Sequence, residues 1–157
     1  MVIYCLYAFL TSLGFGIIFN VKGKNLFLTA LGGGLGWAIY LISNKYNCSE
    51  IFSYFNATIF ISTYSEIVAR KFKAPVTVFL ASSLIPLVPG SGMYYTMFEC
   101  ITGNINAALS IGLTTLSIAG ALATGMILVS SFTRLITSKK KVYYPKELTL
   151  IKESVKR

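Results

Sequence analysis

The chain has 157 residues, of which 55% are apolar or aromatic and 12% are charged, and its mean hydropathy is +0.69. Because soluble domains carry roughly 25% charged residues, this composition excludes both an ordinary soluble domain and a disordered chain. The absence of histidine and the wide separation of the three cysteines exclude a Cys/His zinc site and a Ser/His/Asp triad. We therefore predict no enzymatic activity, no bound metal and no cofactor.

Five stretches of low charge follow one another along the chain. They cover residues 2–20, 26–43, 51–69, 76–102 and 107–133. Each is long enough to cross hydrocarbon about 30 Å thick as a helix of roughly 20 residues. Barrel strands would be about 10 residues long and would alternate in polarity, so helices are the expected structure. The sequence thus predicts an all-α membrane protein with a five-helix transmembrane domain over residues 1–133 and a basic cytoplasmic tail over residues 134–157.

The basic residues lie almost entirely on one side of this predicted arrangement. All of the 14 lysines and arginines except Lys45 fall in the loop after the first helix, in the loop after the third helix, or in the tail. Such residues concentrate on the cytoplasmic side, which predicts an external N-terminus and a cytoplasmic C-terminus. The net charge of +9 therefore requires no nucleic-acid partner. The tail is predicted to be solvated or, through Lys139, Lys140 and Lys141, to lie against anionic lipid headgroups.

Small residues recur at intervals of four in the second and fifth helices. This spacing lets helix backbones approach closely in lipid, where no hydrophobic drive acts between helices. We predict helix packing for all of these residues, with the alternative that the glycines of the second helix expose backbone beside a solute path. The residues are Gly32 and Gly36 in the second helix, and Ser117, Ala121 and Gly125 in the fifth.

The fourth stretch contains the sequence PLVPG from Pro86 to Gly90, which interrupts an otherwise continuous apolar run. Each proline lacks an N–H and clashes with the preceding turn, so a helix is predicted to break here. From Val76 to Pro86 a helix rises about 15 Å, which puts the break near the middle of the bilayer. Irregular backbone at that depth persists only if it is buried in protein or lines a cavity.

After the break, Ser91 is expected to cap a second half-helix whose positive end attracts carboxylates. Broken helices of this kind face anionic substrate groups in many transporters. We therefore predict a substrate site, in which backbone N–H groups bind a carboxylate and Tyr94 limits the cavity. The alternative is a proline kink that only shapes packing. The predicted site residues are Pro86, Pro89, Gly90, Ser91 and Tyr94.

Three polar residues lie near the predicted cytoplasmic ends of the first and third helices. Glu66 and Arg70 are four residues apart in the order that favours an ion pair on a helix. A structural ion pair is one interpretation, and a role at an inner gate is the other. Together with Asn20, they are predicted to form the inner entrance of a solute path.

Several segments together carry a resemblance to a known family. They are residues 14–20 (GFGIIFN), the glycine-rich second helix through Gly36, and residues 74–76 (APV) leading to residues 85–90 (IPLVPG) and Tyr94. In these segments the chain resembles the threonine/serine exporter family, in the small-subunit form that matches the C-terminal half of the fused exporters. The resemblance implies half of an exporter in the bacterial inner membrane, driven by the proton gradient. It also implies a separate larger subunit and, as substrates, hydroxylated amino acids or a dicarboxylate such as succinate.

The number of predicted helices also points to a partner. Five helices with an external N-terminus cannot form two equal inverted repeats, whereas a second five-helix unit of opposite orientation would complete them. We therefore predict half of a secondary exporter whose partners are a larger subunit, membrane lipid and a carboxylate-bearing small molecule. The alternative is a membrane scaffold or assembly subunit that carries no solute. A channel is less favoured because charged rings and a carbonyl-filter motif are absent from the sequence.

Overall fold

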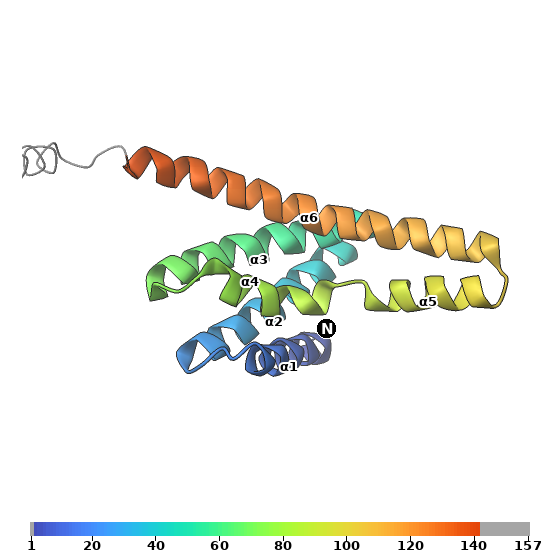
Figure 1. Cartoon of the computed structure of the whole chain (residues 1–157), viewed down its shortest axis with the longest axis horizontal. Coiled ribbons are helices and arrows are strands. Elements are labelled where there is room, and N and C mark those ends of the chain that lie inside the picture. Colours follow the sequence, from blue (N-terminus) through green and yellow to red (C-terminus); the bar gives the residue numbers. More distant parts are fainter. Residues whose placement is uncertain (1, 142–157) are drawn as a thin grey trace, which may run out of the picture.

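A computed structural model of the chain describes the backbone of residues 2–141 and side chains through residue 136. Every regular element in this part is helical, in agreement with the predicted fold class (Figure 1). The elements are α1 (Val2–Ile18), α2 (Lys24–Lys45), α3 (Glu50–Phe72), α4 (Val76–Leu84), the 3₁₀ turn η1 (Ile85–Leu87), α5 (Gly90–Ile101) and α6 (Ile105–Lys141).

The helices occupy the five predicted stretches, and the fourth stretch is divided into α4, η1 and α5. Helix α6 continues to Lys141, past the tail boundary predicted at residue 134, because nothing between these residues breaks a helix. The predicted contact of the tail with water or lipid concerns the side chains of Lys139, Lys140 and Lys141 and residues 142–157, all of which lie outside the described part of the structure.

Helix α2 is central among the first four helices and packs against α1, α3 and α4. Helix α6 runs along one side of the molecule and contacts α3, as Figure 1 shows. Helix α5 doubles back beside the first half of α6, and this hairpin extends away from the group formed by α1 to α4. The break before α5 therefore lies where the hairpin joins that group.

Tight turns connect the helices, and most of them use a residue in the left-handed conformation. At the end of α1, the N–H of Val21 donates to the carbonyl of Gly16 at 2.9 Å, and the intervening Asn20 has a φ of 58°. This is the Schellman arrangement, which satisfies the free carbonyls of a helix end. The same left-handed step occurs after α2, α3 and α5. The four residues concerned are Asn20, Asn47, Lys73 and Gly103.

Two described helices are long and apolar enough to cross a membrane, α2 and residues Ile105–Ile136 of α6. A third crossing is possible in the fourth stretch. There, α4 and η1 form one half and α5 forms the other, and the two halves, bent by 51°, would have to form one span. Helix α1 is apolar but has only 17 residues. Helix α3 has 23 residues, and its buried face carries three serines and a threonine. The structure thus supports two or three crossings by length and composition, and five crossings stay a prediction.

The glycines of α2 face different neighbours. A methyl group added at Gly32 would lie 2.8 Å from the ring of Tyr64, and one added at Gly36 would overlap the side chain of Ile61. Both of these neighbours belong to α3. The pair Gly32 and Gly36 therefore lies at the contact between α2 and α3, where a larger side chain would separate the helices. A methyl group at Gly32 would also lie 2.7 Å from the hydroxyl of Ser83 on α4.

The intervening glycines face α1 instead. A methyl group added at Gly33 would overlap the hydroxyl of Ser12, and one added at Gly34 would lie 3.3 Å from the Cβ of Phe9. Because α2 packs against helices on more than one side, its small residues are consecutive rather than confined to one stripe.

The small residues of α6 lie beside α3. A methyl group at Gly125 would be 3.1 Å from the side chain of Thr58, and Ala121 is buried. Ser117 is exposed and lines a groove of about 470 Å³ between α6 and the first turns of α3. The hydroxyl of Ser117 donates to the carbonyl of Leu113 within its own helix.

The apolar core has two parts. One lies between α2, α3, η1 and α6, and the other between α3 and α4. Phe79 is the largest of the fully buried side chains and packs with the second part. The first part comprises Tyr40, Ala57, Ile61, Leu87, Ile118 and Leu122, and the second comprises Val68, Ala69 and Phe79.

Candidate functional site

The predicted interruption of the fourth stretch is present in the structure. Pro86 has no N–H to donate to the carbonyl of Ser82, so α4 ends and a single 3₁₀ turn follows. Val88 is extended, and its N–H closes this turn by donating to the carbonyl of Ile85 at 3.1 Å. Pro89 then precedes α5, which begins at Gly90. The two prolines thus produce a bend of 51° between the halves.

The prediction that Ser91 caps the second half-helix is wrong. Pro89 occupies the cap position and makes no side-chain hydrogen bond to the helix end. Ser91 stands inside the first turn of α5, where it is exposed. The physical reason is that Pro89 fixes its own φ, here −76°, and helical geometry can then begin directly at Gly90.

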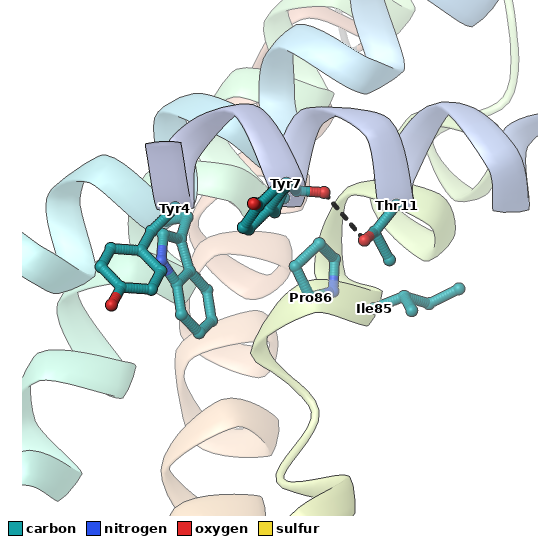
Figure 2. Close-up of a pocket in the computed structure, with 7 residues that line it drawn as sticks. Tyr4, Tyr7, Thr11, Ile85 and Pro86 are labelled. Carbon is teal, nitrogen blue, oxygen red and sulfur yellow. Dashed lines mark hydrogen bonds between the residues drawn. The ribbon is translucent and has the colours of Figure 1, made fainter. Parts of the chain in front are cut away.

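A pocket of about 310 Å³ lies beside the break, between α1, α2 and η1 (Figure 2). Its volume is at the lower end of the range of roughly 300–1,000 Å³ that is typical of small-molecule sites. Helix α1 supplies one wall, and Figure 2 shows the 3₁₀ turn opposite it. The seven lining residues are Tyr4, Tyr7, Ala8, Thr11, Trp37, Ile85 and Pro86.

The pocket lining combines apolar and neutral polar groups and contains no charged residue. The hydroxyl of Thr11 donates to the carbonyl of Tyr7 at 2.8 Å (Figure 2). The indole N–H of Trp37 is buried and has no hydrogen-bond partner among the described residues. An unpaired buried donor costs about 1–3 kcal/mol, so a ligand that accepts this hydrogen bond would be favoured. The arrangement suits a small neutral or zwitterionic molecule.

Of the five predicted substrate residues, Pro86 alone lines this pocket. Pro89 is buried beneath the break, whereas Gly90, Ser91 and Tyr94 are exposed at the start of α5. The ring of Tyr94 stacks on that of Phe98, one turn further along, with 6.3 Å between their centroids. The structure therefore gathers the five residues at one break in the chain but not around one cavity.

The predicted ion pair on α3 is confirmed. A guanidinium nitrogen of Arg70 lies 3.7 Å from a carboxylate oxygen of Glu66. Glu66 is 17% exposed and Arg70 is 52% exposed. Water screens such a pair, so its contribution to stability is small. The pair holds both side chains on one face of α3 near its C-terminal end. A role of this face at an inner entrance stays a prediction.

Asn20, the third residue predicted at the inner entrance, closes α1. Its own N–H donates to the carbonyl of Ile17 at 2.9 Å, and its side chain is exposed. Asparagine tolerates the left-handed conformation better than any β-branched residue. Asn20 therefore has a structural role that does not depend on solute.

This role leads to a prediction for two variants of Asn20. We expect Asn20→Gly to keep the free energy of unfolding, because glycine readily adopts a positive φ. Asn20→Val should lower it by about 1–2 kcal/mol. Unfolding in detergent and solute efflux measure the two roles separately. If Asn20→Gly remained fully stable but lost efflux, the side chain would act at the entrance rather than only at the helix end.

The pocket contains residues that the sequence analysis did not single out. Tyr4, Tyr7 and Thr11 stand three and four residues apart, so they lie on one face of an apolar helix. This hydroxyl-bearing stripe is a signal that could have been found in the sequence. Trp37 is the single tryptophan of the chain. Its proximity to Pro86 could not have been found in the sequence, because it depends on the packing of α2.

Comparison with known proteins supports a family assignment. The family described as "Threonine/Serine exporter, ThrE" matches residues 4–132, which is most of the chain. An uncharacterized protein of Haemophilus influenzae is 27% identical over 96 residues, which are 61% of this chain and 32% of that protein. The matched segment therefore spans about a third of the length of this relative. No solved structure matches the chain. Since the family match extends from α1 through most of α6, the chain belongs to the threonine/serine exporter family ThrE.

Proposed function

We propose that the chain is one half of a secondary exporter in the bacterial inner membrane that moves amino acids of the threonine and serine class. The observation that carries this proposal is the broken fourth stretch with a pocket of about 310 Å³ beside it, in a chain of the exporter family. Interrupted helices next to a cavity are a recurrent means of placing a solute site within a bilayer. The proton gradient is the proposed driving force.

The proposed topology has five crossings, with the N-terminus outside and the C-terminus in the cytoplasm. The distribution of lysine and arginine supports this orientation. Helix α3 is the most polar of the proposed crossings, and its polar face packs against protein. Its contacts with α2, α4 and α6 bury Ser53, Thr58, Ser62 and Ser65, so these hydroxyls do not face lipid. Glu66, Arg70 and Asn20 would then stand at the cytoplasmic side and form the inner entrance.

The proposed solute site begins in the pocket. The indole N–H of Trp37 can donate to a carboxylate, and Pro86 forms the wall at the break. The hydroxyl of Thr11 donates to the carbonyl of Tyr7, so its oxygen can accept a hydrogen bond from the ammonium group of an amino acid. Beyond the break, the positive end of α5 would attract the same carboxylate as it passes Gly90 and Ser91. Tyr94, Pro89 and the first turn of α5 would bound this part of the path.

A larger five-helix subunit of opposite orientation is the proposed partner. No residue of α5 is buried in this chain, and large apolar side chains along α5 face outward. Helices that cross a membrane together bury such surfaces against protein or lipid. The relative from Haemophilus influenzae has further sequence beyond the matched third, which is consistent with a second part in that protein.

The role of the break can be tested by removing its prolines. The double variant Pro86→Ala/Pro89→Ala restores two N–H donors, which allows α4 and α5 to continue as one helix. We expect efflux of threonine and serine to fall to the level of cells that lack the chain. Efflux would be measured in cells that also express a larger exporter subunit. Pro75→Ala is the matched control, because Pro75 caps the start of α4 outside the break and is exposed.

The outcomes of this experiment separate the candidate functions. Full efflux in the double variant, with normal amounts of protein in the membrane, would show that the break is not needed for transport. Efflux that is the same with and without the wild-type chain would favour a scaffold or assembly subunit. Efflux that rises without saturation as internal solute increases would favour a channel. Loss of efflux when an ionophore collapses the proton gradient would support the proposed driving force.

A further inference from the structure

The interface between α1, α2 and α4 contains buried hydroxyls that have no partner. Ser12 of α1 and Ser82 of α4 are both 0% exposed. Neither hydroxyl makes a hydrogen bond within the described part of the chain. Ser83, the neighbour of Ser82, is equally buried but donates to the carbonyl of Thr29 at 2.8 Å. The hydroxyls of Ser12 and Ser82 therefore stay unpaired although a neighbouring serine in the same interface has a partner.

Both hydroxyls point at glycines of a neighbouring helix. The oxygen of Ser12 lies so close to Gly33 that a methyl group there would overlap it. The oxygen of Ser82 would be 4.0 Å from a methyl group at Gly16. The glycines and hydroxyls thus face one another across a closed contact between helices.

This contact adjoins the pocket at the break. Ala8, Ser12 and Gly16 are the buried residues of α1, and they form one stripe along the helix because they are four residues apart. Ala8 also lines the pocket. The stripe leads from the pocket, past the unpaired hydroxyl of Ser12, toward the end of α1 at Asn20.

Unpaired hydroxyls make this closed contact less stable than an apolar contact of the same shape. Buried polar groups are normally hydrogen-bonded, and replacing such a group by an apolar one is neutral or stabilising when it has no partner. Alanine at positions 12 and 82 would fill nearly the same volume. The hydroxyls therefore contribute nothing to the closed arrangement, and a second arrangement that separates the helices would give them partners.

We propose that the α1–α2–α4 interface is the continuation of the solute path and is closed in this structure where Ser12 contacts Gly33. This inference rests on the proposed export function. When α1 moves away from α2 and α4, the hydroxyls of Ser12 and Ser82 bind the passing solute. Helices α1 and α4 contain no charged residue, and α2 carries charge only at its ends, at Lys24 and Lys45. A charged solute would lack a counter-charge there, so the path selects neutral or zwitterionic solutes.

Cysteine accessibility tests this path. The free cysteines Cys5, Cys48 and Cys100 are first replaced by serine. Ser12→Cys and Ser82→Cys are then introduced singly and treated in cells with a small water-soluble methanethiosulfonate reagent, which reacts with a thiolate in contact with water. The matched control is Ser53→Cys, because Ser53 is 0% exposed but its hydroxyl is bonded to the carbonyl of Ser49.

We expect both path cysteines to react faster than the cysteine at position 53, and threonine to slow the reaction whereas succinate does not. Equal slow reaction at all three positions would overturn the proposed path. Protection by succinate but not by threonine would overturn its selectivity. If Ser12→Cys does not accumulate in the membrane, Ser12→Ala provides the second test. It should remain as stable as the wild type while threonine efflux falls, and undiminished efflux would contradict the proposal.

Parallel efflux measurements keep this inference separate from the proposed function. Wild-type efflux of threonine together with unreactive cysteines would leave export intact and refute the path. Reactive cysteines without any wild-type efflux of threonine or serine would refute the export function, while a water-accessible interface would stand.

Discussion

Gly33→Ala should weaken the contact between α1 and α2 and lower the free energy of unfolding. The added methyl group would overlap the hydroxyl of Ser12, and the carbonyl of Ser83 lies 3.4 Å away on another side. Overpacking of this kind costs roughly 1–3 kcal/mol, which is only partly offset by the gain of about 1 kcal/mol in helix propensity. Threonine efflux should fall as well, because α1 can no longer close against α2. Unfolding in detergent and efflux from cells measure the two effects.

Two comparisons show whether the collision with Ser12 is the cause. Gly14→Ala is the matched control on α1, since a methyl group there would meet no atom within 4 Å. That variant should be as stable as the wild type or more stable, by up to about 1 kcal/mol. In a Ser12→Gly background, Gly33→Ala should no longer destabilise, because the colliding side chain is gone. Equal destabilisation by Gly33→Ala in both backgrounds would contradict this account of the interface.

Phe79→Ala should be among the most destabilising single substitutions in the described part of the chain. Phe79 is 0% exposed and packs with Val68 and Ala69 between α3 and α4. Lipid supplies no hydrophobic drive for this contact, but the cavity left by the ring would still remove close van der Waals contacts. We expect a loss of about 3 kcal/mol in the free energy of unfolding, measured by denaturation in detergent.

Phe132→Ala is the control for this substitution. Phe132 lies on α6 and is 68% exposed, so its ring contacts little of the protein. The free energy of unfolding should change by no more than about 0.5 kcal/mol. If both variants lost the same stability, Phe79 would not be a core residue. The described packing of α4 against α3 would then be contradicted.

The positions of the helices and of the break could be predicted from local sequence. Long apolar stretches specify helices in lipid, and Pro86 and Pro89 remove N–H donors wherever the chain places them. The ion pair of Glu66 with Arg70 could be predicted for the same reason, because four residues of helix set its geometry. Ser91 was misplaced as a cap since the exact first residue of a helix depends on the φ that the preceding proline imposes.

The composition of the candidate site could not be predicted in the same way. The pocket joins Thr11 of α1, Trp37 of α2 and Pro86 of η1, which are far apart in the chain. Spacing along a helix indicates which residues share a face, but it does not indicate which other helix that face meets. Gly90 and Tyr94 were placed with Pro86 because they are close in sequence, whereas the bend of 51° turns α5 toward α6.

The sequence by itself determined that this chain is an all-helical membrane protein of an exporter family, with an excess of basic residues and a fourth stretch that cannot be one straight helix. Those properties follow from composition, charge distribution and proline chemistry, which act locally. The tertiary structure alone decided that the consecutive glycines of α2 meet α1 on one side and α3 on another, and that Ser12 closes against Gly33. Such contacts depend on how helices pack across long separations in sequence, and no local interaction specifies them.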